Sequence, residues 1–199
     1  MERWYLRIKA SNRKKLFFIF ILFPLLSFQP YDDCGTYRWD YKILVDATGW
    51  PLLDIIPKNK TVPGLNNIPR PTVLGKQRTP YEKWKVKVTA WVVMLGGEGD
   101  RDYHLVLTNT ARTDSLIAEI PDPTCQKLTH FPALKTKYRN ARTFVDDNIE
   151  APGSSVEELA TPVKVTVTGF LFFDIKAHGH GHAKNGIEIH PITEIKLAN

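Results

Sequence analysis

The sequence predicts a mainly β protein: a five-stranded, partly open Greek-key barrel of the OB-fold type, with one helix between strands three and four and an irregular N-terminal arm. Two observations lead to this prediction. Five segments alternate apolar with polar residues, which is typical of strands with one buried face. One helical pattern follows the third segment, and this order fits an OB-fold better than a β-sandwich, which has more strands and no inserted helix.

The first three predicted strands form a meander. They cover residues 84–95, 103–110 and 115–120, and the short connections "GGEGDRD" and "ARTD" separate them. Every second side chain in the alternating parts of these segments is apolar, so each strand has one face suited to a core. Connections of this length join antiparallel neighbours, so we expect the three strands to lie side by side in chain order.

A helix is predicted over residues 132–149, followed by the last two strands at 163–174 and 187–197. Gly169 is expected to mark a bulge in strand four, and Pro191 a bulge or an edge position in strand five. The helical prediction rests on apolar residues at spacings of four, three and four. These residues are Leu134, Tyr138, Ala141 and Val145.

The chain divides into three predicted segments. Residues 1–28 carry six basic residues and then a 13-residue apolar run, which indicates a signal peptide; an uncleaved N-terminal anchor is the alternative. The run is shorter than the ~20 residues of a transmembrane helix, and membrane contact is expected through this segment alone. Residues 29–79 form a Pro-rich arm packed on the barrel, and residues 80–199 form the barrel. We therefore expect an exported protein, in the periplasm, on the cell surface or secreted.

Charge and cysteine content bear on partners and compartment. The net charge is +6, but residues 1–28 contribute six basic residues and one acidic residue, so the rest of the chain is near +1. Nucleic acid is therefore a disfavoured partner, since phosphate binding normally rests on clustered Lys and Arg. The two cysteines, Cys34 and Cys125, are expected to form a disulfide in an exported protein, with two free thiols as the alternative.

Five polar residues are the candidate site. If the aliphatic residues of strands two, three and five face inward, their acidic and imidazole neighbours face outward on a common surface. In an OB-fold, the faces of strands two and three bind oligonucleotides or oligosaccharides. The five ligand or metal candidates are Asp102, His104, Glu119, Glu188 and His190.

Four interpretations of these residues remain open. They form a hydrogen-bonded ladder, with Arg38, Arg101 or Lys42 as counter-charges; they bind a divalent metal such as zinc or manganese; a carboxylate polarises His104 or His190 for acid–base work; or they bind a ligand without chemistry. The metal and acid–base interpretations require an accessible site, whereas the ladder predicts burial under the arm. No common nucleophile, nucleotide or zinc-ribbon motif is present.

Two further features are weaker candidates. The loop "HGHGH" places His178, His180 and His182 at alternate positions, where three imidazoles can chelate a metal, although the intervening glycines make ordering costly. Trp39 is one of several tryptophans that could stack on a sugar or a base. We treat Trp39 and Arg38 as supporting residues. The acidic turn "EGDRD" lacks the ligand spacing of a calcium loop.

Several blocks together resemble an uncharacterised family of exported bacterial OB-fold-like proteins: "CGTYRWDYKILVD", "GDRDYHLVL", "IAEIPDPTC", "VTGFLFFD" and "NGIEIHPITEI". The resemblance spans about residues 34–197. It implies that the Cys34 block and the barrel form one unit, and it brings no established activity. The family loop reads "HGQxGxAxNG" where this chain has "HGHGHAKNG", which argues against His180 and His182 as ligands shared by the family.

The sequence therefore predicts an exported OB-fold binding or interaction module. Its partner is a small molecule, an oligosaccharide or a protein, bound on the outer face of strands two, three and five. The alternative is a metal-dependent hydrolase, nuclease-like, with the same five residues around the ion. A structural envelope protein without a small ligand is a third possibility.

Overall fold

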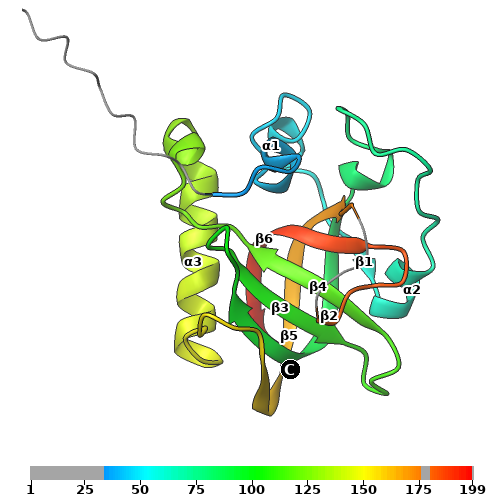
Figure 1. Ribbon diagram of the computed structural model, residues 1–199, viewed down its shortest axis with the longest axis vertical. Coiled ribbons are helices and arrows are strands. Elements are labelled where there is room, and N and C mark those ends of the chain that lie inside the picture. Colours follow the sequence, from blue (N-terminus) through cyan, green and yellow to red (C-terminus); the bar gives the residue numbers. More distant parts are fainter. Residues whose placement is uncertain (1–33, 176–179, 199) are drawn as a thin grey trace, which may run out of the picture. The chain divides into compact units, whose positions relative to one another are not determined.

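The computed structural model describes residues 34–175 and 180–198 of the chain, as a mainly β protein built on one mixed six-stranded sheet (Figure 1). The predicted signal segment, residues 1–28, lies outside the described residues. In chain order, the strands are β1 (Lys58–Lys60), β2 (Lys85–Gly97), β3 (Tyr103–Thr108), β4 (Ser115–Ile120), β5 (Glu157–Phe173) and β6 (Ile187–Leu197).

The strands pair in the order β1-β2-β3-β4-β6-β5, and β5 also pairs with β2. The meander of β2, β3 and β4 is antiparallel, as its short turns predict. The β4–β6 pairing is parallel, and the β6–β5 and β5–β2 pairings are antiparallel. The pairings therefore place β3, β4 and β6, which carry the predicted site, next to one another.

The strand count of five is wrong, because the arm contributes a sixth strand. β1 pairs in parallel with residues Val86 to Val88 of β2. It consists of the polar sequence KNK, and two of its three residues are exposed. Its residues show no apolar alternation, and only its backbone pairing makes it a strand. The sequence pattern therefore could not reveal it.

One long helix, α3 (Pro132–Asn148), follows β4 as predicted, and its four predicted apolar residues are all buried. Its Tyr138 hydroxyl donates a hydrogen bond of 2.8 Å to the carbonyl of Ile43 in the arm. The other helices are short: α1 (Trp39–Lys42), η1 (Trp50–Leu52), α2 (Val62–Asn66), η2 (Tyr81–Lys83) and η3 (Gln126–His130). Among the residues described, none of the helices has the length and apolar character to span a membrane.

Both faces of β3, β4 and β6 are covered at the site. Leu105, Ala118 and Ile189 belong to the core cluster and are fully buried, as the alternation predicts. Their neighbours Val106 and Ile117 are also buried but lie outside that cluster. On this second face, a Cβ atom at Gly181 would overlap the side chain of Val106, so the backbone at Gly181 lies directly on the sheet.

The pairing of β5 with β6 is irregular around Gly169 and Pro191, where the sequence predicts bulges. The pairing of β5 with β6 shifts register on both sides of Gly169. A Cβ atom at this position would overlap the carbonyl oxygen of Pro191. Glycine is therefore required by the close approach of two backbones, which is the role expected for it in a bulge.

Buried arginines join the arm to the sheet. The Arg38 guanidinium contacts both carboxylate oxygens of Glu82, at 2.7 and 2.9 Å, and Glu82 is fully buried. Glu82 also accepts a hydrogen bond of 3.1 Å from the amide of Phe173 at the end of β5. Arg78 binds Asp46 at 2.6 Å, and Arg70 donates to the carbonyl of Asp174 at 2.5 Å. These contacts connect the arm with the strand ends that border the site.

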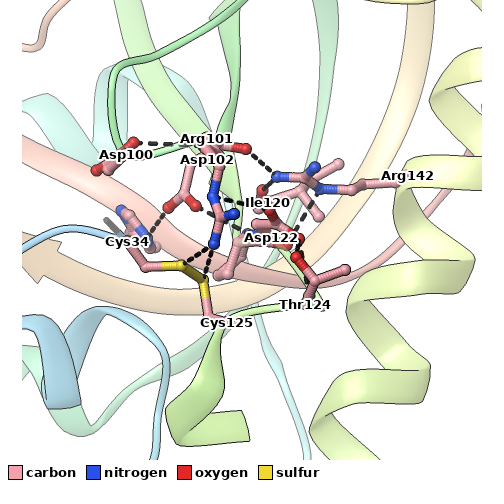
Figure 2. Close-up of a disulfide and its surroundings, with 11 residues drawn as sticks. Cys34, Asp100, Arg101, Asp102, Ile120, Asp122, Thr124, Cys125 and Arg142 are labelled. Atoms are coloured by element: carbon pink, nitrogen blue, oxygen red, sulfur yellow. Dashed lines mark hydrogen bonds and ion pairs between the residues drawn. A yellow bond between two sulfur atoms is a disulfide. The ribbon is translucent and has the colours of Figure 1, made fainter. Parts of the chain in front are cut away.

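The predicted disulfide between Cys34 and Cys125 is present, with its Cα atoms 6.0 Å apart (Figure 2). It links the start of the arm to the segment after β4, across 91 positions. A loop of this length corresponds to a stabilisation on the order of 4 kcal/mol in the chain-entropy model. The Arg101 guanidinium lies beside the disulfide and pairs with Asp122 at 3.1 Å.

We predict that Glu82→Gln lowers the free energy of unfolding by about 3–5 kcal/mol, because it leaves the buried Arg38 guanidinium without its counter-charge. Urea unfolding at pH 7 measures this. The matched control is Glu194→Gln, which removes an exposed carboxylate 3.9 Å from Lys196 and should change stability by less than about 0.5 kcal/mol. Equal effects of the two substitutions would contradict the role assigned to Arg38 and Glu82.

Candidate functional site

The five predicted site residues come together on the outer face of β3, β4 and β6. Pairing of the strands places His104 opposite Glu119, and Ile117 opposite Glu188. All five side chains are buried, as the ladder interpretation predicts, whereas the metal and acid–base interpretations require an accessible site. Their exposed fractions are 0% for Asp102, 2% for His104, 3% for Glu119, 5% for Glu188 and 0% for His190.

Four of the five side chains, with Glu98, form a continuous series of contacts, which we call the imidazole–carboxylate chain. Asp102 Oδ2 lies 3.2 Å from His190 Nε2, and His190 Nδ1 lies 2.5 Å from Glu119 Oε2. Glu119 Oε1 is 3.1 Å from His104 Nδ1, which is also 2.6 Å from Glu98 Oε1. The arrangement is that of the ladder interpretation, with acid and imidazole groups alternating.

The contacts of the chain differ in kind. The contact between His104 and Glu119 satisfies hydrogen-bond geometry. The two contacts of His190 have ion-pair distances, but their angles fall outside that geometry. We therefore treat His190 as an imidazole held by charge between two carboxylates. Because both of its ring nitrogens face protein carboxylates and the ring is fully buried, His190 has no surface for acid–base work on a substrate.

Charge pairing outweighs burial at both histidines. Burial alone would lower the pKa of His104, but hydrogen bonds to Glu119 and Glu98 raise it to about 10. Burial likewise opposes the charged form of His190, and the negative charge of Glu119 raises its pKa to about 9. Burial raises the pKa of Asp102 to about 6, with His190 partly offsetting the effect. At neutral pH both imidazoles are therefore cationic.

Glu119 is the centre of the chain. Burial disfavours its ionised form, yet the charge of His190 and the hydrogen bond from His104 hold its pKa well below the ordinary value. Lys42 of α1 adds a third positive group, with its Nζ atom 3.8 Å from Glu119 Oε2. Burial would lower the pKa of Lys42, but Glu119 and Glu188 raise it above its usual value. A charged Lys42 therefore ties the arm to β4.

A cavity of about 520 Å³ lies between the arm and the sheet, and three of the five predicted residues line it: His104, Glu119 and Glu188. Asp102 and His190 lie behind it. The remaining lining residues come from the arm, from the β2–β3 turn, from β4 and from the segment after β5. They are Gly35, Thr36, Tyr37, Trp39, Lys42, Glu98, Asp100, Ile117, Asp174 and Ile175.

The cavity is lined by more acidic than basic side chains, and one of the carboxyl groups has no hydrogen-bond partner among the described residues. Five carboxyl side chains line it against two basic ones, Lys42 and His104. Glu188 Oε2 is buried without a hydrogen-bond partner, and the carboxyl group takes part in no hydrogen bond or ion pair with the described residues. Burial first and then the charge of Glu119 raise the pKa of Glu188 to about 8. The group is therefore mostly protonated at neutral pH.

The supporting residues have different roles from those expected. Trp39 lines the cavity and packs edge-on against the His190 ring, with centroids 6.2 Å apart. Arg38 pairs with Glu82, outside the cavity lining. Arg101 pairs with Asp122 beside the disulfide (Figure 2). Of the three expected counter-charges, Lys42 is the one that contacts Glu119.

The loop histidines that the structure describes are not among the potential metal ligands of the site. His178 lies outside the described residues, and His180 accepts a contact of 3.2 Å from His104 Nε2 through its backbone carbonyl. Two groups of potential metal ligands occur within residues 34–175 and 180–198, and neither includes His180 or His182. They are Glu98, His104 and Glu119, and Asp102, Glu119 and His190, with ligand atoms within 4.8 Å of one another.

Comparison with known proteins adds no assignment. No protein-family model matches the chain, and no curated protein matches it either. The function must therefore be inferred from the geometry of the cavity and the groups around it.

Several residues of the site were missed by the sequence reasoning. Glu98 and Asp100 lie in the acidic turn that lacks the ligand spacing of a calcium loop, and Asp174 ends a predicted strand. Their acidity was visible, but nothing in the sequence shows that the turn folds toward β4. Tyr37 carried no signal, because its position in the cavity depends on how the arm crosses the sheet.

We predict that stability falls as the pH rises from about 6.5 to about 10. The pKa values of His104 and His190 are higher in the folded protein than the ordinary 6.5, so their contribution is complete below pH 6.5 and lost through about 9 to 10. Glu188 acts in the same direction. Urea unfolding at a series of pH values in this range measures how the free energy of unfolding changes with pH. This pH dependence should be weaker in His104→Asn and unchanged in His130→Asn, which alters an exposed histidine. A flat wild-type profile would refute the pairing.

Proposed function

We propose that the chain is an exported OB-fold-like binding module that holds a small ligand in the cavity between its arm and the outer face of β3, β4 and β6. Pairing that runs from β2 through β3, β4, β6 and β5 back to β2 supports the OB-like part of the proposal. The position of α3 before β5 supports it too, since this is the element order of that fold. The extra strand β1 belongs to the arm.

The cavity is the observation that carries this proposal. Its volume of about 520 Å³ falls within the roughly 300–1,000 Å³ of small-molecule sites. It lies on the face where OB domains bind their ligands. Its walls combine aromatic side chains, Tyr37 and Trp39, with convergent polar groups such as Glu188. A surface that served only to bury the arm would gain nothing from such a space.

Charge and redox chemistry support the class of ligand and the compartment. Five carboxyl groups against two basic groups repel phosphate, so a nucleic acid is disfavoured by the cavity as well as by the near-neutral chain. The disulfide is compatible with an oxidising, extracellular environment. Together with the predicted signal segment, it supports export.

We predict that small ligands of the protein bind in this cavity. The full chain is mixed with a library of amines, amino acids, neutral sugars and dicarboxylates and followed by NMR. Binding should change the chemical shifts of Tyr37, Trp39 and Ile117 most. Thr36→Trp, at an exposed lining position, should obstruct the cavity and weaken any binding at least tenfold. Thr129→Trp, at an exposed position outside the lining, is the control. Binding that survives Thr36→Trp would place the ligand elsewhere.

A metal-dependent hydrolase is the second candidate, favoured by one group of ligand atoms. Glu98, His104 and Glu119 line the cavity, so an ion held by them would be open to a substrate. Both carboxylates contact the same His104 nitrogen, so the ion would replace the proton there. An imidazole with two carboxylates suits zinc or manganese. The group of Asp102, Glu119 and His190 is buried on all sides, so it offers no open position.

Metal analysis tests the hydrolase candidate. If it is right, protein purified without a His tag contains about one zinc or manganese ion per chain, and His104→Ala loses it. His130→Ala, at an exposed histidine, should retain the metal. Metal-free wild-type protein that also takes up no zinc or manganese in equilibrium dialysis would remove this candidate and leave the binding module.

A further inference from the structure

We propose that the ligand of the cavity is a small organic cation, whose ammonium or guanidinium group binds beside the Glu188 carboxyl group. This inference rests on the proposed binding function and names its ligand class. It comes from the charge of the cavity, the unpartnered carboxyl group within it, and the size of the space.

The charge of the lining disfavours anionic ligands. Five carboxyl groups and two basic groups are found among the described lining residues; with Glu188 protonated and Lys42 and His104 charged, the other four carboxylates still exceed the basic groups by two. The two basic groups already contact carboxylates: Lys42 lies 3.8 Å from Glu119, and His104 lies 2.6 Å from Glu98. An anionic ligand would therefore meet excess negative charge and no cation without a protein partner.

Glu188 supplies an observation independent of the acidic composition. Its side chain is 5% exposed, it lines the cavity, and it has no hydrogen bond or ion pair with any residue that the structure describes. A buried acceptor without a partner is unfavourable, and a donor group of the ligand would satisfy it. An ammonium or guanidinium group supplies both the donor and the charge.

The surroundings of Glu188 fit an organic cation better than a bare ion. The space of about 520 Å³ is far larger than one coordinated metal ion needs. Tyr37 and Trp39 line the same space, and aromatic rings favour alkylammonium and guanidinium groups. The carbon skeleton of such a ligand could also cover Ile117 on the floor of the site.

Isothermal titration calorimetry of the full chain in EDTA tests the inference with charge-matched probes. The cations are 1,4-diaminobutane, agmatine and glucosamine; 1,4-butanediol and glucose are the neutral counterparts of the first and third, and succinate is the anion. At least one cation should bind tenfold or more tightly than its neutral counterpart, and succinate should not bind. Thr36→Trp should weaken the cation at least tenfold.

The variant Glu188→Gln keeps the shape of the side chain but cannot ionise when a cation binds beside it. It should weaken cation binding at least tenfold, whereas Glu194→Gln, an exposed position on the same strand β6, should leave it unchanged. If Glu188→Gln does not fold, Asp100→Asn, on the β2–β3 turn, should still weaken the cation threefold or more.

The outcomes separate this inference from the proposed function. Equal binding of cation and neutral counterpart, lost in Thr36→Trp, would overturn the cationic ligand and leave the binding module. No binding by any of the three cations would overturn the inference, and zinc binding without EDTA would then favour the metal candidate. Cation binding that is unaffected by Thr36→Trp would overturn both the ligand site and the inference.

Discussion

The buried carboxylate of Glu119 is the interaction on which the site depends. It lies within 2.5 Å of His190, 3.1 Å of His104 and 3.8 Å of Lys42, so three positive groups from β6, β3 and α1 converge on one side chain of β4. A carboxylate this deeply buried is tolerated only when it is paired, and removing its partners would leave an uncompensated charge. Glu119 therefore couples three neighbouring strands and the arm in one electrostatic unit.

The arm covers this electrostatic unit. The disulfide, the Arg38–Glu82 pair and the hydrogen bond from Arg70 to the carbonyl of Asp174 hold the arm against the sheet, and the covered part of the imidazole–carboxylate chain, from Asp102 to His104, is buried. Water exclusion strengthens each charge contact and also makes Glu188, which has no partner, difficult to ionise. The same packing that stabilises Glu119 thus leaves one acidic group and a cavity available to a ligand. Stability and binding are consequences of one arrangement.

The sequence predicts the parts of this arrangement that follow from local periodicity. Strand alternation is sufficient to place His104 beside Glu119 and to bring Glu188 and His190 to the same face, and the helix stripe predicts which side of α3 is buried. It does not show the arm over that face, since the Arg38–Glu82 contact joins positions 44 apart in an irregular segment. The sequence therefore left open whether this polar face is accessible or buried, and β1 was missed for a similar reason.

The charge state of the two histidines tests this account most directly. Nitrogen chemical shifts of the His104 and His190 rings, measured at pH 7.5 on ¹⁵N-labelled protein, report whether each ring nitrogen carries a proton. If Glu119 binds two cationic imidazoles, all four ring nitrogens carry a proton. In Glu119→Gln, a fraction of each imidazole should lose one proton and become neutral. A neutral tautomer at either histidine in the wild-type protein would contradict the central role of the Glu119 carboxylate.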